Sequence, residues 1–239
     1  MKIIGLIGGT SWQSTTDYYK IINETVDARL KNNHSAKLIL NSLDFAEIEY
    51  CVNRNAFEEI GVIMVKAARS IENAGADCVL LCANTMHMFD KAVAEAVSIP
   101  LIHIAEATIN MIKQRSITKL GLLGTKITME MDFYKQKYIE SGLDIMIPDD
   151  DDRKFVNSVI FSELFKGNIN PDSKARLIEI IEKFKDQGVQ GVILGCTELP
   201  LIIKQDDTSL LVFDTTEIHA QAAVDFALKG QASSLKNTL

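Results

Sequence analysis

Two stretches of this chain, GADCVLL at residues 75–81 and GVQGVIL at residues 188–194, share a glycine turn that leads into an apolar strand. Apolar runs of this length alternate along the chain with amphipathic stretches of helical length, which indicates βαβ units around a largely parallel sheet. Two more pairs of segments match in the same order. These are residues 4–8 with 120–124, and residues 101–103 with 212–214.

The matched segments predict an internal repeat. Their offsets lie between 111 and 116 residues, a drift that insertions in loops explain. We predict an α/β fold of two pseudo-symmetric, three-layer α/β/α domains with mainly parallel sheets, the first over residues 1–98 and the second over residues 99–207. Residues 208–239 are expected to pack back on the first domain. Because parallel sheets bind ligands beyond the carboxyl ends of their strands, we expect the active site in the cleft between the two domains.

The composition limits the partners of the chain. Hydrophobic residues make up 47% of the 239 residues, and 25 basic against 32 acidic residues give a net charge of −7. Nucleic acids and anionic membranes attract basic surfaces, so neither is expected as a partner. The N-terminal apolar run is too short for a secretory signal, and no run reaches the roughly 20 residues of a membrane span. We expect a cytoplasmic protein with reduced cysteines.

Small polar residues follow the first strand of each half. Gly8-Gly9-Thr10-Ser11 ends the first strand, and Thr125 and Thr128 follow its counterpart. Glycines allow a ligand to approach the backbone, and amides and hydroxyls at a helix start bind carboxylates. These residues are therefore candidates for substrate binding, with ordinary helix capping as the alternative.

Cysteines stand where the third strand of each half ends. Cys82 lies in LCANTMH at residues 81–87, and Cys196 lies in LGCTELP at residues 194–200. A thiol in such a turn lies near the positive end of a helix dipole, which lowers its pKa below the usual value of about 8.5. We expect Cys196 to be a catalytic thiol that ionises near neutral pH, with a buried structural cysteine as the alternative.

Residues 8–12 (GGTSW), 82–87 (CANTMH) and 195–198 (GCTE) together resemble the aspartate/glutamate racemase superfamily, and the resemblance covers nearly the whole chain. It implies a racemase that needs neither pyridoxal phosphate nor another cofactor nor a metal, and that commonly forms a homodimer. One cysteine from each half flanks the substrate α-carbon. One residue removes the α-proton and the other returns a proton on the opposite face.

The resemblance also implies which residues bind an aspartate- or glutamate-like substrate. Donors aimed at the carboxylate oxygens stabilise the charge that develops when the α-proton leaves. The candidates are Gly9, Thr10, Ser11, Asn84, Thr85, Thr125, Thr128 and Thr197, with Lys166 as a basic contact to the side-chain carboxylate and His87 and Glu198 as auxiliary residues.

The chain departs from the family motif at Ala83. The first cysteine of the family stands immediately before Asn-Thr, and Ala83 occupies that position here. The internal repeat agrees, because the offset of 113 residues pairs Ala83 with Cys196 and Cys82 with Gly195. Adjacent side chains of a strand point to opposite faces, so we expect Cys82 to project away from the position that Ala83 faces. Cys82 is therefore only a secondary candidate for the second base.

Three functions remain open at this point. In the first, the protein is an amino-acid racemase in which Cys196 serves one face while water, Thr85 or Cys82 serves the other. In the second, it is a single-cysteine decarboxylase or isomerase of a small carboxylic acid, as arylmalonate decarboxylase is. In the third, it is a catalytically impaired module that binds an amino acid or dicarboxylic acid.

Three other features are given structural interpretations. The acidic run at residues 149–152 is interpreted as a solvated loop, with no further metal ligands in view. The sequence GLIGG at residues 5–9 lacks a third glycine at the spacing of a dinucleotide-binding turn, so NAD is not expected. Glu106, Asp214 and His219 are interpreted either as groups that orient the thiols or as helix-capping residues.

Overall fold

The computed structural model describes residues 1–229, which divide into two compact units. Unit 1 is formed by Met1–His103 together with residues 219–229 of the described C-terminal part, and unit 2 is formed by Ile104–Ile218. Residues 208–218, which we expected with the first domain, lie in unit 2 because their strand pairs with the second sheet. Residues 230–239 of that expected segment lie outside the described residues.

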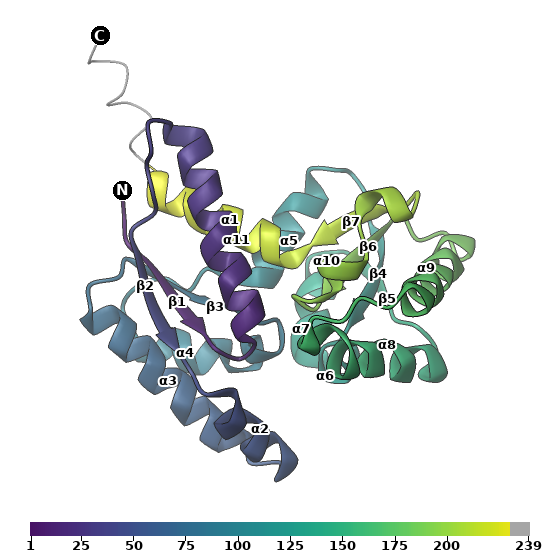
Figure 1. Ribbon diagram of the computed structural model, residues 1–239, viewed down its shortest axis with the longest axis horizontal. Helices are drawn as coiled ribbons and strands as arrows, with labels where there is room; N and C mark the ends of the chain where they lie inside the picture. The colour runs from purple at the N-terminus through teal and green to yellow at the C-terminus, as the bar shows by residue number, and fades with distance from the viewer. Residues whose placement is uncertain (230–239) are drawn as a thin grey trace. The chain divides into compact units, whose positions relative to one another are not determined.

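Unit 1 contains a parallel three-stranded sheet in the order β2-β1-β3 (Figure 1). Its strands are β1 (Ile4–Gly8), β2 (Leu38–Ser42) and β3 (Cys78–Leu81). Its helices are α1 (Trp12–Leu30), α2 (Phe45–Asn53), α3 (Phe57–Asn73), the 3₁₀ helix η1 (Thr85–Phe89), α4 (Asp90–Ala96) and the later part of α11 (Thr215–Leu228). Next to β3, Leu101 forms an isolated parallel bridge with Val79.

Side chains alternate between the two faces of the first sheet, which gives unit 1 three layers. Leu6 and Leu80 are buried in a cluster with residues of α1 and α11. Ile7 and Leu81 are buried in a second cluster, with residues of α3. Each fully buried side chain of this size contributes roughly 1.5–3 kcal/mol relative to exposure. Both faces of the sheet are covered, so β1 and β3 are continuous apolar runs.

Unit 2 contains a parallel four-stranded sheet in the order β5-β4-β6-β7. Its strands are β4 (Lys119–Gly124), β5 (Asp144–Met146), β6 (Gly191–Gly195) and β7 (Leu211–Asp214). Its helices are α5 (Ile104–Lys113), α6 (Lys126–Glu130), α7 (Asp132–Glu140), α8 (Asp150–Ser162), η2 (Leu164–Lys166), α9 (Pro171–Asp186), α10 (Leu199–Ile202), η3 (Gln205–Asp207) and the first residues of α11.

The two units share strand order and register. The pairs at corresponding positions are Ile4–Cys78 and Leu120–Gly191 between the first and third strands, and Val79–Leu101 and Val192–Val212 at the next position. Each of these residues belongs to a segment pair that the sequence repeat matches. The predicted α/β fold with parallel sheets is confirmed. The two copies of the sequence repeat correspond to the two sheets, one in each unit.

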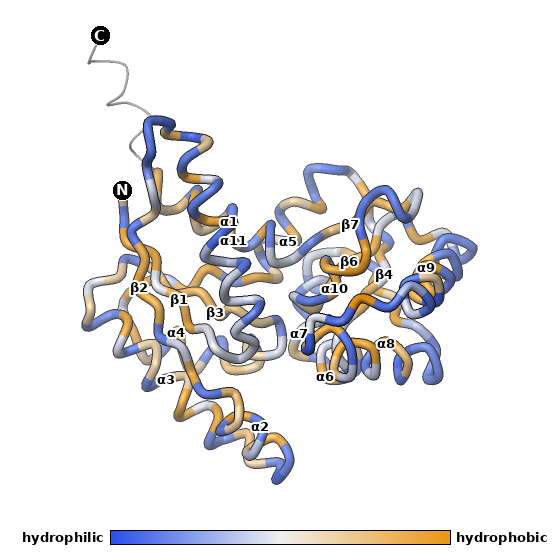
Figure 2. The backbone as a smooth tube through the Cα atoms, viewed as in Figure 1, coloured by the Kyte–Doolittle hydropathy of each residue, from blue (hydrophilic) through white to orange (hydrophobic). Residues whose placement is uncertain are grey.

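Hydropathy follows the layers of each unit. Figure 2 shows hydrophobic residues along the strands, whereas helices such as α3 and α9 alternate between hydrophilic and hydrophobic residues. This is the pattern of surface helices that cover a sheet with one face. None of the helices between residues 1 and 229 has both the length and the hydropathy that a membrane span requires.

Candidate functional site

The turn after β1 requires glycine. Gly9 has φ +84, and a Cβ atom at this position would collide with the backbone of Leu43. The Gly9 amide donates to Thr15 Oγ1 over 2.9 Å, and the Ser11 side chain caps α1 by accepting from the Ser14 amide. The hydroxyl of Thr10 is buried and has no hydrogen-bond partner among residues 1–229. Ser11 thus serves as a cap, while Thr10 presents an unsatisfied polar atom that a ligand could satisfy.

The turn after β3 places Cys82 and Ala83 on opposite sides. Cys82 is 1% exposed and packs in the cluster that contains α1 and α11 residues. Ala83 packs against the cluster on the other face. Burial raises the pKa of the Cys82 thiol far above its ordinary range, so this thiol stays protonated. The Cys82 side chain therefore points to the face of the sheet opposite to the one that Ala83 faces.

The segment after Ala83 forms η1. Asn84 occupies the N-cap position and is buried, but its side chain makes no capping hydrogen bond. Thr85 is half-buried at the start of η1. His87 lies one turn further on, where Nδ1 is 3.0 Å from the carbonyl oxygen of Ala83. The candidates Ala83, Asn84, Thr85 and His87 therefore come together in one turn.

The turn after β6 joins Cys196 to a carboxylate. The Sγ atom of Cys196 donates to Oε2 of Glu198 over 3.0 Å, and Thr197 Oγ1 donates to the same oxygen over 2.8 Å. All three residues are buried. The other carboxylate oxygen, Oε1 of Glu198, is buried without a hydrogen-bond partner in the described chain. Glu198, an auxiliary candidate from the sequence, is thus the direct partner of the thiol.

The pKa of Cys196 differs from the sequence-based expectation. Burial, and secondly the charge of Glu198, raise the pKa of the thiol well above its ordinary value. The backbone amides of Thr197 and Glu198 act in the opposite direction but are the weaker influences. The helix that follows, α10, spans only Leu199–Ile202, so its dipole is small. The expectation of a thiolate near neutral pH is therefore wrong for the free protein, which holds Cys196 as a thiol.

The turn after β4 lies beside the Cys196 turn. Gly124 pairs with Gly195, the residue before Cys196, and Thr128 packs over both glycines. A Cβ atom on Gly195 would lie 2.8 Å from Leu122 Cδ1 and 3.1 Å from the carbonyl oxygen of Leu123, so a side chain here would force its neighbours to shift. Thr125 caps α6 through the amide of Thr128, and their hydroxyl oxygens are 3.0 Å apart. The candidates Thr125, Thr128 and Thr197 thus belong to one edge of the second sheet.

Residues near the end of β7 include one that sequence reasoning missed. Thr216 has a buried hydroxyl without a hydrogen-bond partner in the described part of the chain. Asp214 accepts from the amides of Thr216 and Glu217, which is the helix-capping interpretation. The position of Thr216 just beyond a strand end, like that of Thr10, is the signal that could have identified it. Lys166 lies exposed in η2, where its amide donates to the carbonyl oxygen of Glu163.

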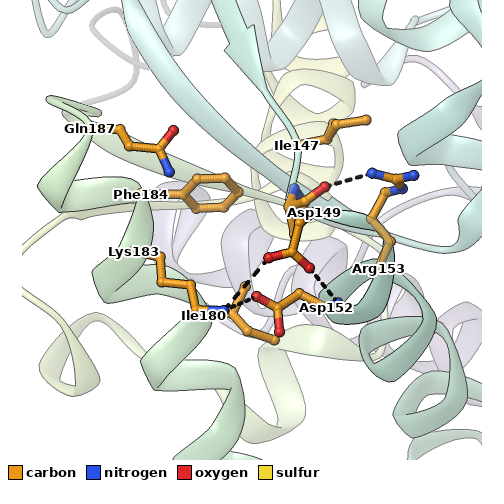
Figure 3. Close-up of a pocket in the computed structure, with 9 residues that line it drawn as sticks. Ile147, Asp149, Asp152, Arg153, Ile180, Lys183, Phe184 and Gln187 are labelled. Carbon is orange, nitrogen blue, oxygen red and sulfur yellow. Dashed lines mark hydrogen bonds and ion pairs between the residues drawn. The ribbon is translucent and has the colours of Figure 1, made fainter.

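A pocket of about 350 Å³ lies in unit 2 between the end of β5, α8 and α9 (Figure 3). Asp149 and Asp152 of the acidic run line it. The run is the N-cap and first turn of α8 rather than a loop; Asp149, Asp150 and Asp151 are exposed as expected, whereas Asp152 is 2% exposed. Asp152 pairs with Arg176 over 2.7 Å and also with Lys183. Its charge is compensated within the protein, and none of the candidate site residues lines this pocket. We therefore do not assign the function to it.

Metal ligation is not evident in the described residues. No three His, Cys, Asp or Glu side chains between residues 1 and 229 are arranged to hold a metal ion.

Comparison with known proteins identifies the class. The family model of the Asp/Glu/Hydantoin racemases matches residues 7–223, so the chain belongs to this family. A Yersinia pestis protein described as a candidate Asp/Glu racemase has 47% sequence identity and a TM-score of 0.91, over 95% of this chain and 100% of that one. An aspartate racemase homologue from Pyrococcus horikoshii OT3 has 39% identity and a TM-score of 0.85, over 95% and 99% of the two chains.

A curated relative is more distant. The broad specificity amino-acid racemase RacX of Bacillus subtilis is 25% identical over 175 residues, which are 73% of this chain and 75% of RacX. The family match over residues 7–223 agrees with the resemblance that residues 8–12, 82–87 and 195–198 indicate.

Proposed function

We propose that the protein is a cofactor-independent amino-acid racemase that acts on aspartate- or glutamate-like substrates with Cys196 as a proton-transferring thiol. The observation that carries the proposal is the 3.0 Å hydrogen bond from Cys196 Sγ to Glu198 Oε2 in a buried strand-end turn. Membership of the Asp/Glu/Hydantoin racemase family supplies the substrate class.

The carboxylate of Glu198 gives the thiol two states. With the proton on sulfur, Cys196 is an acid that returns a proton to the substrate carbanion. When Glu198 Oε2 accepts that proton, the resulting thiolate is a base that removes the α-proton. Because burial and the charge of Glu198 raise the pKa of Cys196, the thiolate forms only when the proton moves along this hydrogen bond.

The unsatisfied buried atoms match the groups of an amino acid. Within unit 2, the hydroxyl of Thr216 offers a hydrogen bond to a carboxylate and Glu198 Oε1 accepts from an ammonium group; within unit 1, the hydroxyl of Thr10 likewise offers a hydrogen bond to a carboxylate. An unpaired buried polar atom costs about 1–3 kcal/mol, which a bound ligand recovers. Hydroxyls aimed at the α-carboxylate also stabilise the charge that spreads into it after deprotonation.

A second candidate function follows from Ala83. The position of the first family cysteine carries no acid, and Ala83 packs against apolar residues. A decarboxylase or isomerase of a small carboxylic acid needs a proton on one face only, which Cys196 alone could supply. A binding module that retains the hydroxyl turns without turnover is the remaining alternative.

Incubation of the protein with each enantiomer of aspartate and glutamate, followed by chiral chromatography, tests the proposal. Appearance of the opposite enantiomer supports a racemase. Release of carbon dioxide from a substituted malonate, without interconversion of the amino acids, would instead identify the decarboxylase. Calorimetric binding of aspartate or glutamate without conversion and without exchange of the α-proton would identify the binding module.

A further inference from the structure

Helix α3 of unit 1 has two unlike faces. One face packs against the first sheet (Figure 1) with side chains that are at most 2% exposed, namely Ile60, Met64, Ala67, Ala68 and Ile71. The opposite face carries a row of residues that we call the outer row of α3, formed by Glu58, Val62, Val65 and Arg69. Successive members are four, three and four positions apart, so they lie in line along the helix.

The middle of the outer row is apolar. Val62 is 69% exposed, although valine is a residue type that proteins usually bury. Beside it lies a hollow of about 510 Å³, where α3 meets the residues at the junction of η1 and α4. Gly61 opens this hollow, because its missing side chain leaves the ring of Phe89 uncovered next to the helix. Glu58 is the only charged residue in the lining of this hollow. An apolar hollow with a polar rim is typical of a protein contact surface.

A second hollow, of about 460 Å³, continues along α3 toward its C-terminal end. Val62 and Val65 line both hollows, and the second also contains Lys66 and Arg69. The exposed face of α3 is therefore acidic where the helix begins, apolar in the middle and basic toward its end.

The charges at the two ends of this face form no ion pair within residues 1–229. This holds for Glu58 and Lys66, and the guanidinium of Arg69 donates only from Nε to the carbonyl oxygen of Ala96, over 3.4 Å. The carboxylate of Glu72, one turn beyond Arg69, accepts instead from the amide and hydroxyl of Ser98. Both ends of the outer row can therefore pair with charges on another molecule.

The outer row is complementary to its own reverse. When the helix is turned end to end about the midpoint of residues 63–64, Glu58 falls opposite Arg69 and Val62 falls opposite Val65. The same reversal converts every α3 residue that lines the first hollow into one that lines the second: Phe57, Glu58, Gly61, Val62 and Val65 become Ser70, Arg69, Lys66, Val65 and Val62. Self-complementarity of this kind is what a twofold symmetric contact between identical chains requires.

We propose that the outer row of α3 is the contact surface for a second copy of this chain, with the two α3 helices packed antiparallel across a twofold axis at residues 63–64. Val62 then packs against the partner's Val65, and Glu58 pairs with the partner's Arg69. Each contact occurs twice because of the symmetry. The homodimer expected from the sequence is thereby given a specific surface and a specific register.

The apolar and charged parts of this surface have different effects. Burial of the valines supplies affinity, at about 25 cal/mol for each Å² of apolar surface removed from water. Ion pairs at the rim add little affinity but select the direction of packing. A parallel arrangement would bring Glu58 next to the same residue of the other copy, and likewise Arg69. Lys66 extends its apolar stem over the partner's Gly61, where no side chain obstructs it.

Charge reversal tests the antiparallel register. Glu58→Arg brings two basic groups together at each end of the contact, and Arg69→Glu brings two acidic groups together. Either substitution alone should raise the Kd of the dimer at least about tenfold. An equimolar mixture of the two variants should associate about as tightly as the wild-type protein, because opposite charges then meet at both ends. Analytical ultracentrifugation over a concentration series measures each Kd, and rescue by mixing also shows that both variants are folded.

Val62→Asp tests the apolar centre. A carboxylate buried there without a partner should raise the Kd by about 10²-fold or more. Because Val62 is exposed in the single chain, circular dichroism should show an unchanged fold. The matched control is Ile139→Asp, at a residue of α7 that is 50% exposed, which should leave the Kd unchanged.

Three outcomes would overturn the proposal. A wild-type chain that stays monomeric at every concentration would exclude the dimer. A dimer that tolerates Val62→Asp would use another surface. Single charge reversals that weaken the dimer, but whose mixture does not restore it, would contradict the pairing of Glu58 with the partner's Arg69.

Discussion

Cys196 Sγ and Glu198 Oε2 lie 3.0 Å apart, so a thiol and a carboxylate share one proton in a buried turn after β6. The negative charge of Glu198 adds to burial in raising the pKa of the thiol. The same carboxylate that keeps the proton on sulfur in the free protein is therefore the group that can accept it during catalysis.

Glu198→Gln should separate these two effects. The substitution removes the charge at nearly constant volume, so the pKa of Cys196 should fall toward its ordinary value. The rate of racemisation should nevertheless fall by about 10²-fold or more, since the amide cannot accept the thiol proton. The pH dependence of iodoacetamide alkylation, followed at the Cys196 peptide by mass spectrometry, measures the pKa. An unchanged pKa together with an unchanged rate would remove Glu198 from the mechanism.

Cys82→Ala should leave most of the racemisation intact. The Cys82 side chain is buried in the apolar cluster on the face opposite Ala83 and carries no proton-transfer role in this account. The expected change is a moderate loss of stability, seen in urea unfolding. Chiral chromatography checks the activity, and a loss as large as that of a Cys196 variant would reverse the roles assigned to the two thiols.

Gly9→Ala should destabilise the protein more than Gly75→Ala does. Both glycines have positive φ, which costs a residue with a Cβ atom about 1–2 kcal/mol. At Gly9 the added Cβ also collides with the backbone of Leu43, whereas at Gly75 no heavy atom lies within 4 Å. Urea unfolding of the two variants measures the difference. Equal losses would contradict the close approach of the Gly9 turn to Leu43.

The buried histidines should make the protein acid-sensitive. In the folded state burial lowers the pKa of His219 to about 3, and that of His87 lies well below 6.5. Above about pH 6.5 both states are neutral; below it the unfolded state binds a proton at each histidine and the folded state does not. As the pH falls below about 6.5, the free energy of unfolding should therefore decrease by up to about 1.4 kcal/mol per pH unit for each histidine.

Urea unfolding at pH values between about 7 and 5 tests this slope, because the carboxyl groups with lowered pKa titrate further down. His219→Gln should reduce the slope by the contribution of one histidine, and His34→Asn, at an exposed position, is the control for replacing a histidine. Stability that is constant over this interval would mean that the histidines are protonated in the folded protein.

The sequence predicts those features that depend on local pattern. Strand alternation predicts that Cys82 and Ala83 face opposite ways, and the repeat offset predicts that Val79–Leu101 and Val192–Val212 occupy equivalent positions in their sheets. Both depend on residues close in sequence or on a period that can be counted.

Features that depend on three-dimensional burial could not be predicted in this way. The pKa of Cys196 is set by desolvation and by the direction of the Glu198 side chain, neither of which is visible in GCTE. Asp152 is buried because Arg176 and Lys183 reach it from α9. The rings of His87, His103 and His219 likewise come together from η1, the segment before α5, and α11, which are far apart along the chain.

Exchange of the substrate α-proton in deuterium oxide tests the central claim most directly. Wild-type protein and the Cys196→Ala variant are incubated with each enantiomer of aspartate and glutamate, and the α-proton signal is followed by NMR. We expect exchange by the wild-type protein and a loss of at least about 10²-fold in a correctly folded Cys196→Ala variant. Exchange by Cys196→Ala at the wild-type rate would contradict the role of Cys196 as the thiol that removes the α-proton.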